Sequence, residues 1–133
     1  DKYRLKVIDY SCFLINKLLF LEDKNSEILN TYRGLLISMN NNSNYLVDLI
    51  KLELEILKSS GYQPDLSDSV IKKVLGDGFS INANSYDELS ILLKNDRGSQ
   101  EAFSNFMEKV IVKVLNNLNI NLPFNRSEII QKN

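Results

Sequence analysis

Apolar residues recur at three- and four-residue steps along most of this chain, which is the spacing of one face of an α-helix. Before residue 60, three segments show the pattern, separated by polar stretches at 23–25 and 40–44. We therefore expect three antiparallel helices joined by short loops. In the first helix, the positions expected to face the core are Leu5, Ile8, Cys12, Ile15, Leu18 and Leu19.

The third of these helices carries clear boundary signals. Ser43 or Asn44 can cap its start. Gly61 supplies a left-handed position that ends many helices, and Pro64 prevents the helix from resuming. Its apolar residues expected to point inward are Leu46, Leu49, Ile50, Leu54 and Leu57.

The second half of the chain predicts shorter elements and then one long helix. Residues 69–75 predict a short helix, and 79–83 alternate weakly enough to form a short extended segment. Asn84 or Ser85 caps the next helix, and Glu88 is placed for a capping box with Ser85. A long helix over about 99–118 is followed by a tail from 124 to 131. The predicted fold class is all-α, an antiparallel helical bundle in one domain spanning 1–133.

Composition excludes several classes of function. The net charge of −1 gives no bulk attraction to nucleic acid or anionic lipid. One cysteine and no histidine cannot form a four-ligand zinc site, so we expect no metal and no cofactor. Cys12 is expected to be a buried, inert thiol. Without a signal peptide or an apolar stretch long enough to span a bilayer, the chain is expected in the cytoplasm.

Four segments together resemble a known family. The segment Leu52-Glu53-Leu54, followed by Gly61-Tyr62 and Asp65-Leu66, resembles the helical half of RecO, the bacterial recombination mediator. The stretch Leu14–Leu19 resembles the opening helix of that half, with an acidic break after it, and the tail 122–126 resembles its Pro-x-x-Ser-Arg ending.

This resemblance implies a non-catalytic role in recombinational DNA repair. The expected activities are annealing of complementary strands and loading of the RecA recombinase. The expected partners are the C-terminal tail of the single-stranded-DNA-binding protein, RecR and DNA, with no membrane.

The chain also departs from the family pattern. The N-terminal OB-fold barrel of RecO is missing, so we interpret the chain as a piece of a longer protein. Ser69 stands where many relatives carry the first zinc cysteine, and Asn125 replaces the usual serine of the tail. These departures predict no zinc and only weak binding of DNA by this fragment.

The resemblance also suggests candidate binding residues. Lys51 precedes the Leu-Glu-Leu signature, where it could meet the terminal carboxylate of the partner's tail, with Leu54 and its apolar neighbours as the slot. The alternative for Lys51 is an ordinary surface lysine. Arg126 could hold either an acidic side chain or a phosphate. Lys109 and Lys113 lie four residues apart on one helix face, as phosphate ligands or as a solvated surface.

No enzyme motif is present. The chain has no histidine base, no glycine-rich phosphate loop and no metal-ligand cluster. Glu53 and Glu55 are two residues apart on a helix and therefore point to different faces, so neither is expected to be catalytic. Two alternatives to RecO remain open: an unrelated all-α adaptor module, and the helical lobe of an enzyme whose catalytic part lies elsewhere.

Overall fold

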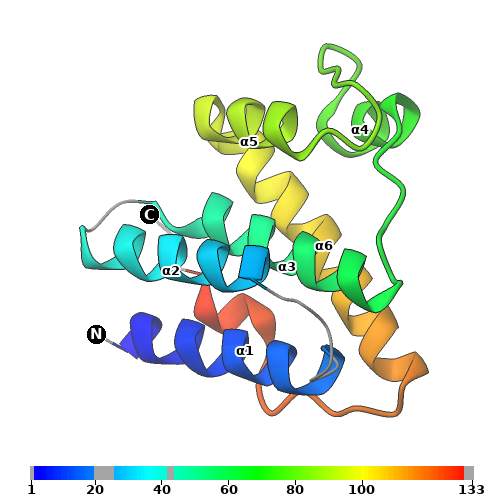
Figure 1. Ribbon diagram of the computed structural model, residues 1–133. Coiled ribbons are helices and arrows are strands. Elements are labelled where there is room, and N and C mark those ends of the chain that lie inside the picture. The colour runs from blue at the N-terminus through cyan, green and yellow to red at the C-terminus, as the bar shows by residue number, and fades with distance from the viewer. Residues whose placement is uncertain (1, 20–25, 42–43, 131–133) are drawn as a thin grey trace.

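The computed structural model describes residues 2–19, 26–41 and 44–130. Within these ranges the chain forms α1 (Lys2–Leu18), α2 (Ser26–Asn40), α3 (Leu46–Ser60), α4 (Asp68–Leu75), α5 (Tyr86–Asn95), α6 (Arg97–Asn117) and the short 3-10 helix η1 (Arg126–Ile129) (Figure 1). The all-α class is confirmed, and these ranges contain no strand. No helix in them is long and apolar enough to cross a membrane. The predicted break at 23–25 and the cap at Ser43 lie outside the described residues.

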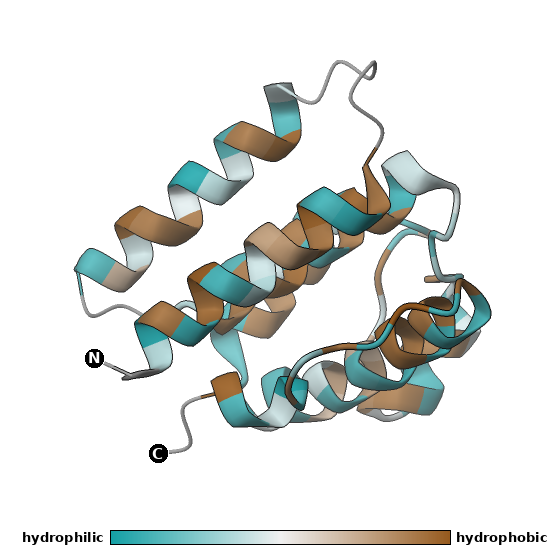
Figure 2. Cartoon of the chain, turned by 90° about the horizontal axis from the view of Figure 1, so that it is seen from below, coloured by the Kyte–Doolittle hydropathy of each residue, from teal (hydrophilic) through white to brown (hydrophobic). Residues whose placement is uncertain are grey.

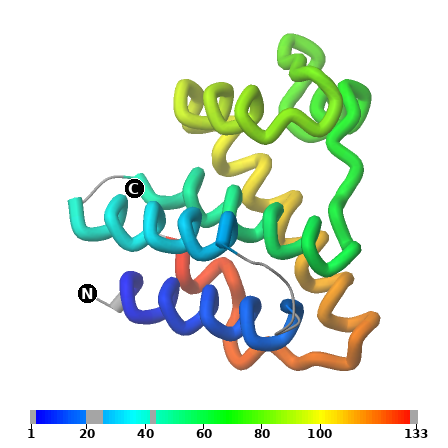
Figure 3. The backbone as a smooth tube through the Cα atoms, viewed as in Figure 1, coloured from blue at the N-terminus to red at the C-terminus, as the bar shows by residue number. Residues whose placement is uncertain are grey.

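Helix α3 is the centre of the fold. It packs against α1, α2, α5 and α6, and Figures 1 and 3 show these helices arranged around it. Every residue from Leu52 to Leu57 is buried. A helix that is buried all round is normally apolar all round, yet two of these six residues are Glu53 and Glu55. Burying a carboxylate is costly unless it is paired, so the surroundings of these two groups matter for stability.

Helix α1 buries a different face from the one predicted. Its buried stripe is Val7, Tyr10, Leu14 and Leu18. The prediction for Leu5 and Cys12 was wrong, since Leu5 is 64% exposed and the Cys12 thiol is exposed as well. The two stripes have the same helical spacing and share Leu18, and in the buried one the Tyr10 hydroxyl donates to Glu53.

Two of the expected helix ends are confirmed, but α3 has Tyr45 at its N-cap in place of the predicted Asn44. Gly61 adopts a left-handed conformation with φ of 86°, and its N–H donates to Lys58 O. The Ser85 hydroxyl accepts a hydrogen bond from the N–H of Glu88. The other half of the predicted capping box does not form, because the Glu88 carboxylate accepts instead from the N–H of Asn82 at 2.7 Å.

The predicted extended segment at 79–83 is irregular and forms no strand. It belongs to a connection that folds back on itself. Asn84 has a φ of 61°, its N–H donates to Leu66 O, and its side-chain oxygen accepts from the N–H of Leu66. This pair of contacts ties the start of α5 to the residues that follow α3.

The C-terminal tail returns from the end of α6 to the first helix. The long helix spans Arg97–Asn117, close to the predicted 99–118. After it the chain turns back so that η1 packs on α1. The Tyr45 hydroxyl at the start of α3 donates to Ile129 O at 2.7 Å. In Figure 2, viewed from below, hydrophobic and hydrophilic bands alternate along the helices, as expected for helices with one buried face.

Candidate functional site

A buried ion pair joins the central helix to the C-terminal tail. The guanidinium of Arg126 donates from Nε to Glu53 Oε2 and from Nη2 to Glu53 Oε1, both at 2.7 Å. Its Nη1 donates to the backbone oxygen and to the hydroxyl of Ser104, at 2.9 and 2.8 Å. The Tyr10 hydroxyl donates to Glu53 Oε2 at 2.5 Å. The cluster thus links α1, α3, α6 and η1, and we call it the Glu53 cluster.

The cluster shifts the pKa values of two of its members, Arg126 and Tyr10. Burial by itself lowers the pKa of the Arg126 guanidinium, but the adjacent Glu53 carboxylate and its hydrogen bonds raise that pKa by more. For Tyr10, burial and then the Glu53 charge raise the pKa well above its ordinary value. The phenol is therefore neutral and the guanidinium charged at any physiological pH.

The expected nucleic-acid contact at Arg126 needs correction. Its side chain is 2% exposed and makes four hydrogen bonds to Glu53 and Ser104. A phosphate could reach this guanidinium only by displacing the Glu53 carboxylate. Of the two alternatives predicted for Arg126, the structure supports pairing with an acidic side chain.

Lys51 and Leu54 are not brought together at an open slot. Leu54 is 1% exposed and belongs to the core, so the prediction that it lines a slot was wrong. Lys51 is half-buried, one helical turn before Glu55, and its charge lowers the pKa of that carboxyl group. Beyond Glu55, Lys58 Nζ lies 5.8 Å from the centroid of the Tyr86 ring. We call Lys51, Lys58 and Tyr86 the α3–α5 surface.

Glu55 interacts electrostatically with all three residues of this surface, and its own carboxylate is only partly satisfied. It is buried, and its Oε2 has no hydrogen-bond partner among the described residues. Burial raises the pKa of Glu55 above its ordinary value, against the opposing effects of Thr31 and Lys51. The Tyr86 hydroxyl is likewise buried without a described partner. Burial and then the Glu55 charge raise the pKa of Tyr86.

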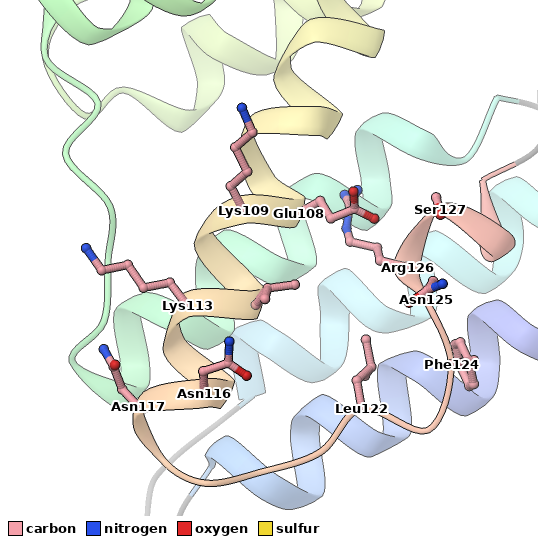
Figure 4. Close-up of a pocket in the computed structure, with 11 residues that line it drawn as sticks. Glu108, Lys109, Lys113, Asn116, Asn117, Leu122, Phe124, Asn125, Arg126 and Ser127 are labelled. Carbon is pink, nitrogen blue, oxygen red and sulfur yellow. The ribbon is translucent and has the colours of Figure 1, made fainter.

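An open groove lies between the second half of α6 and the tail (Figure 4). It has a volume of about 820 Å³. Its α6 side includes Lys109 and Lys113, which are both exposed, so the structure places these two predicted residues at one groove. The tail supplies Leu122 and Phe124. The full lining is Glu108, Lys109, Val112, Lys113, Asn116, Asn117, Leu122, Phe124, Asn125, Arg126 and Ser127.

Sequence reasoning missed several members of these sites. Tyr10 and Ser104 gave no signal, because a tyrosine and a serine on amphipathic helices are ordinary. Phe124 was not connected with Lys113, because the two residues stand 11 positions apart in the sequence. A signal did exist for Glu53, because a carboxylate among the apolar residues of α3 is costly to bury without a partner.

The described residues hold no group of three or more potential metal ligands. Ser69, which stands where many relatives carry a cysteine, is exposed, and its hydroxyl lies 3.1 Å from that of Ser67. Ser67 in turn caps α4 by accepting from the N–H of Val70. The start of this helix is thus organised by hydroxyl groups.

Comparison with known proteins gives one family. The family model described as the C-terminal part of recombination protein O matches residues 1–128. No curated protein and no solved structure matches the chain significantly. The match covers nearly the whole chain, including every residue of the Glu53 cluster.

Proposed function

The chain belongs to the recombination protein O family as its helical C-terminal region, with a role in DNA recombination and repair, and we propose on that premise that it is a non-catalytic mediator module. In this proposal it binds the tail of the single-stranded-DNA-binding protein and RecR, and so supports strand annealing and RecA loading. The family match sets aside the alternative that the helical resemblance is a coincidence with an unrelated adaptor.

The Glu53 cluster supports a non-catalytic role. A catalytic carboxylate must be reachable by a substrate and able to exchange a proton near neutral pH. Glu53 is fully buried and both of its oxygens accept hydrogen bonds from Arg126. Its chemistry is that of a structural ion pair. Removing one partner of such a pair strongly destabilises the folded protein.

The α3–α5 surface carries the proposal for the partner's tail. By the family resemblance, that tail carries acidic residues and ends in apolar residues, one of them aromatic, with a free carboxylate. Lys51 and Lys58 offer two cations on one stripe of α3. They are seven residues apart, which is nearly two helical turns. The half-buried Tyr86 ring lies beside Lys58. We assign the carboxylate to Lys51 and the aromatic residue of the tail to the Tyr86 ring, in place of the buried Leu54.

Calorimetric titration of the tail peptide into the chain tests this assignment. Lys51→Met should weaken binding of the peptide several-fold. An exposed ion pair contributes about 0.2–1 kcal/mol, and the terminal carboxylate adds a charged hydrogen bond. Lys51→Glu should weaken it further. Since Lys51 also stabilises the Glu55 carboxylate, the melting temperature of each variant must be measured alongside.

Lys109→Met is the matched control, because it removes an exposed lysine charge from a different face. The proposal requires that this variant bind the peptide as the parent does. Removing the terminal apolar residue of the peptide should nearly abolish binding. No heat and no chemical-shift change at millimolar peptide would overturn the partner assignment. Equal effects of Lys51→Met and Lys109→Met would show non-specific attraction instead.

A further inference from the structure

Helices α3 and α5 each bury one polar group without a partner where they pack together. Glu55 of α3 is 8% exposed, and its Oε2 accepts no hydrogen bond from the described residues. The Tyr86 hydroxyl, in the first turn of α5, is buried in the same unsatisfied state. Burial and then the Glu55 charge raise the pKa of Tyr86, so the two groups act on each other. Because an unpaired buried carboxylate costs free energy, Glu55 opposes the packing of α5 on α3.

The charged groups around Glu55 do not neutralise it. Burial is the largest effect on this carboxyl group and raises its pKa above the ordinary value of 4.5. Thr31 of α2 and then Lys51 of α3 lower that pKa, Glu27 of α2 raises it, and Lys58 of α3 lowers it. Neither lysine forms a salt bridge with Glu55 among the described residues. The folded protein therefore holds a proton on Glu55 more tightly than an exposed carboxylate would.

Polar contacts fasten the opposite, C-terminal end of α5. Gln100 Nε2 donates to Leu93 O at 2.8 Å, and Gln100 Oε1 accepts from Asn44 Nδ2 at 2.5 Å. Asp96 both ends α5 and begins α6, and its carboxylate accepts from the Ser99 hydroxyl at 2.6 Å. Figure 1 shows α5 passing directly into α6 at this end. A movement of α5 would therefore pivot here and lift its first turn from α3.

We propose that Glu55 is a proton-controlled latch for α5. With a proton on this carboxyl group α5 stays closed on α3, and without it the first turn of α5 opens and admits water. The physical reason is that a neutral carboxyl group costs far less to bury than an ionised one and also gains an O–H donor. The exposed Lys58 lies 5.8 Å from the centroid of the Tyr86 ring, a contact that contributes little at an exposed site.

The latch gives the opening of α5 a definite dependence on pH. Because the closed state has the higher pKa, opening releases a proton, and the opening equilibrium constant rises with pH. The rise is at most about tenfold per pH unit, and it ends above the pKa of the closed state. Opening separates Tyr86 from Lys58, so the α3–α5 surface is complete only in the closed state. The test below uses no peptide, so the latch and the partner assignment can fail separately.

Amide hydrogen exchange of the chain between pH 4 and pH 8 tests the latch, since exchange reports local opening. The quantity compared is the ratio of α1 to α5 protection factors, each corrected for the intrinsic exchange rate at that pH. We expect this ratio to rise at least about threefold over the range. Glu55→Gln should abolish the rise, because an amide stays neutral at every pH. The matched control, Glu101→Gln at an exposed position of α6, should behave as the parent does.

Tyr86→Phe separates the latch from a general loss of packing. This variant keeps the ring beside Lys58 and removes the unpaired hydroxyl, so protection of α5 should increase while its pH dependence remains. The latch is overturned if the ratio is independent of pH in the parent, because Glu55 then acts on global stability alone. It is also overturned if Glu101→Gln flattens the ratio as much as Glu55→Gln does. Lower protection of α5 in Tyr86→Phe would equally contradict it, by showing that the hydroxyl has a partner in the closed state.

Discussion

Glu53 and Arg126 lie 73 residues apart in the chain and form two parallel hydrogen bonds of 2.7 Å inside the protein. Both side chains are almost completely shielded from water. This pair fastens the tail that forms one wall of the groove to the helix at the centre of the fold. The position of Phe124 therefore depends on an interaction that is not visible from the groove itself.

The first prediction concerns the stability of this pair. Arg126→Ala leaves the Glu53 carboxylate buried without its cation and should lower the free energy of unfolding by about 3–5 kcal/mol. Urea denaturation measures the change. The matched control, Arg97→Ala, removes an exposed arginine at the start of α6 and should change stability by less than about 0.5 kcal/mol. Similar losses for the two variants would show that the buried pair has no special importance.

Tyr10→Phe tests the third member of the cluster. The substitution keeps the ring and removes the hydroxyl that donates to Glu53 Oε2. Because the acceptor is charged, the expected loss is about 1.5–3 kcal/mol by the same denaturation measurement. In the Arg126→Ala background the two losses should not add, because all three groups share one network. Simple additivity would contradict the shared network.

The third prediction uses the buried Glu55. Burial raises the pKa of this carboxyl in the folded state above its unfolded value. The sign follows from linkage: the group contributes stability below its unfolded pKa and loses that contribution as pH rises through the folded pKa. Glu55→Gln should therefore stabilise the protein relative to the parent at pH 7, and the difference should shrink towards the acidic end. Glu101→Gln, at an exposed position of α6, should show no such trend. A pH-independent effect of Glu55→Gln would contradict the raised pKa.

The fourth prediction concerns Cys12, which the sequence analysis placed in the core and the structure exposes. The native protein should react with a thiol reagent at nearly the rate of the denatured protein. Its thiol lies 3.7 Å from the Tyr32 hydroxyl, and burial together with this contact raises the pKa of Tyr32 to about 12. Protection of the thiol until the protein unfolds would show that Cys12 is buried, as the sequence analysis predicted.

The last prediction is that the protein holds no zinc. The chain has one cysteine and no histidine, so elemental analysis should find no stoichiometric metal. A chelator should leave the melting temperature unchanged. Stoichiometric zinc would mean that carboxylates, or a second copy of the chain, supply ligands.

The sequence by itself determined the helices and their ends. Apolar spacing and local capping residues act over one or two turns, so the end of α3 at the left-handed Gly61 and the cap at Ser85 can both be predicted from neighbouring residues. The family could also be recognised from the sequence, because its signature Leu52-Glu53-Leu54 and its tail arginine are local patterns. The partial capping box and the irregular 79–83 segment show the limit of that reasoning. In both, the N–H of Asn82 is a competing local partner for the Glu88 carboxylate.

The tertiary structure alone decided which face of α1 is buried and what each charged group contacts. Two stripes on α1 have the same spacing, and the buried one contains Tyr10, whose hydroxyl meets a carboxylate 43 residues away. Arg126 could hold a phosphate or an acid by its chemistry, and only the packing of η1 against α1 and α3 places Glu53 in its reach. Phe124 likewise joins Lys109 and Lys113 only because the tail turns back along α6. Such pairings depend on the path of the chain between the partners, and helical periodicity carries no information about that path.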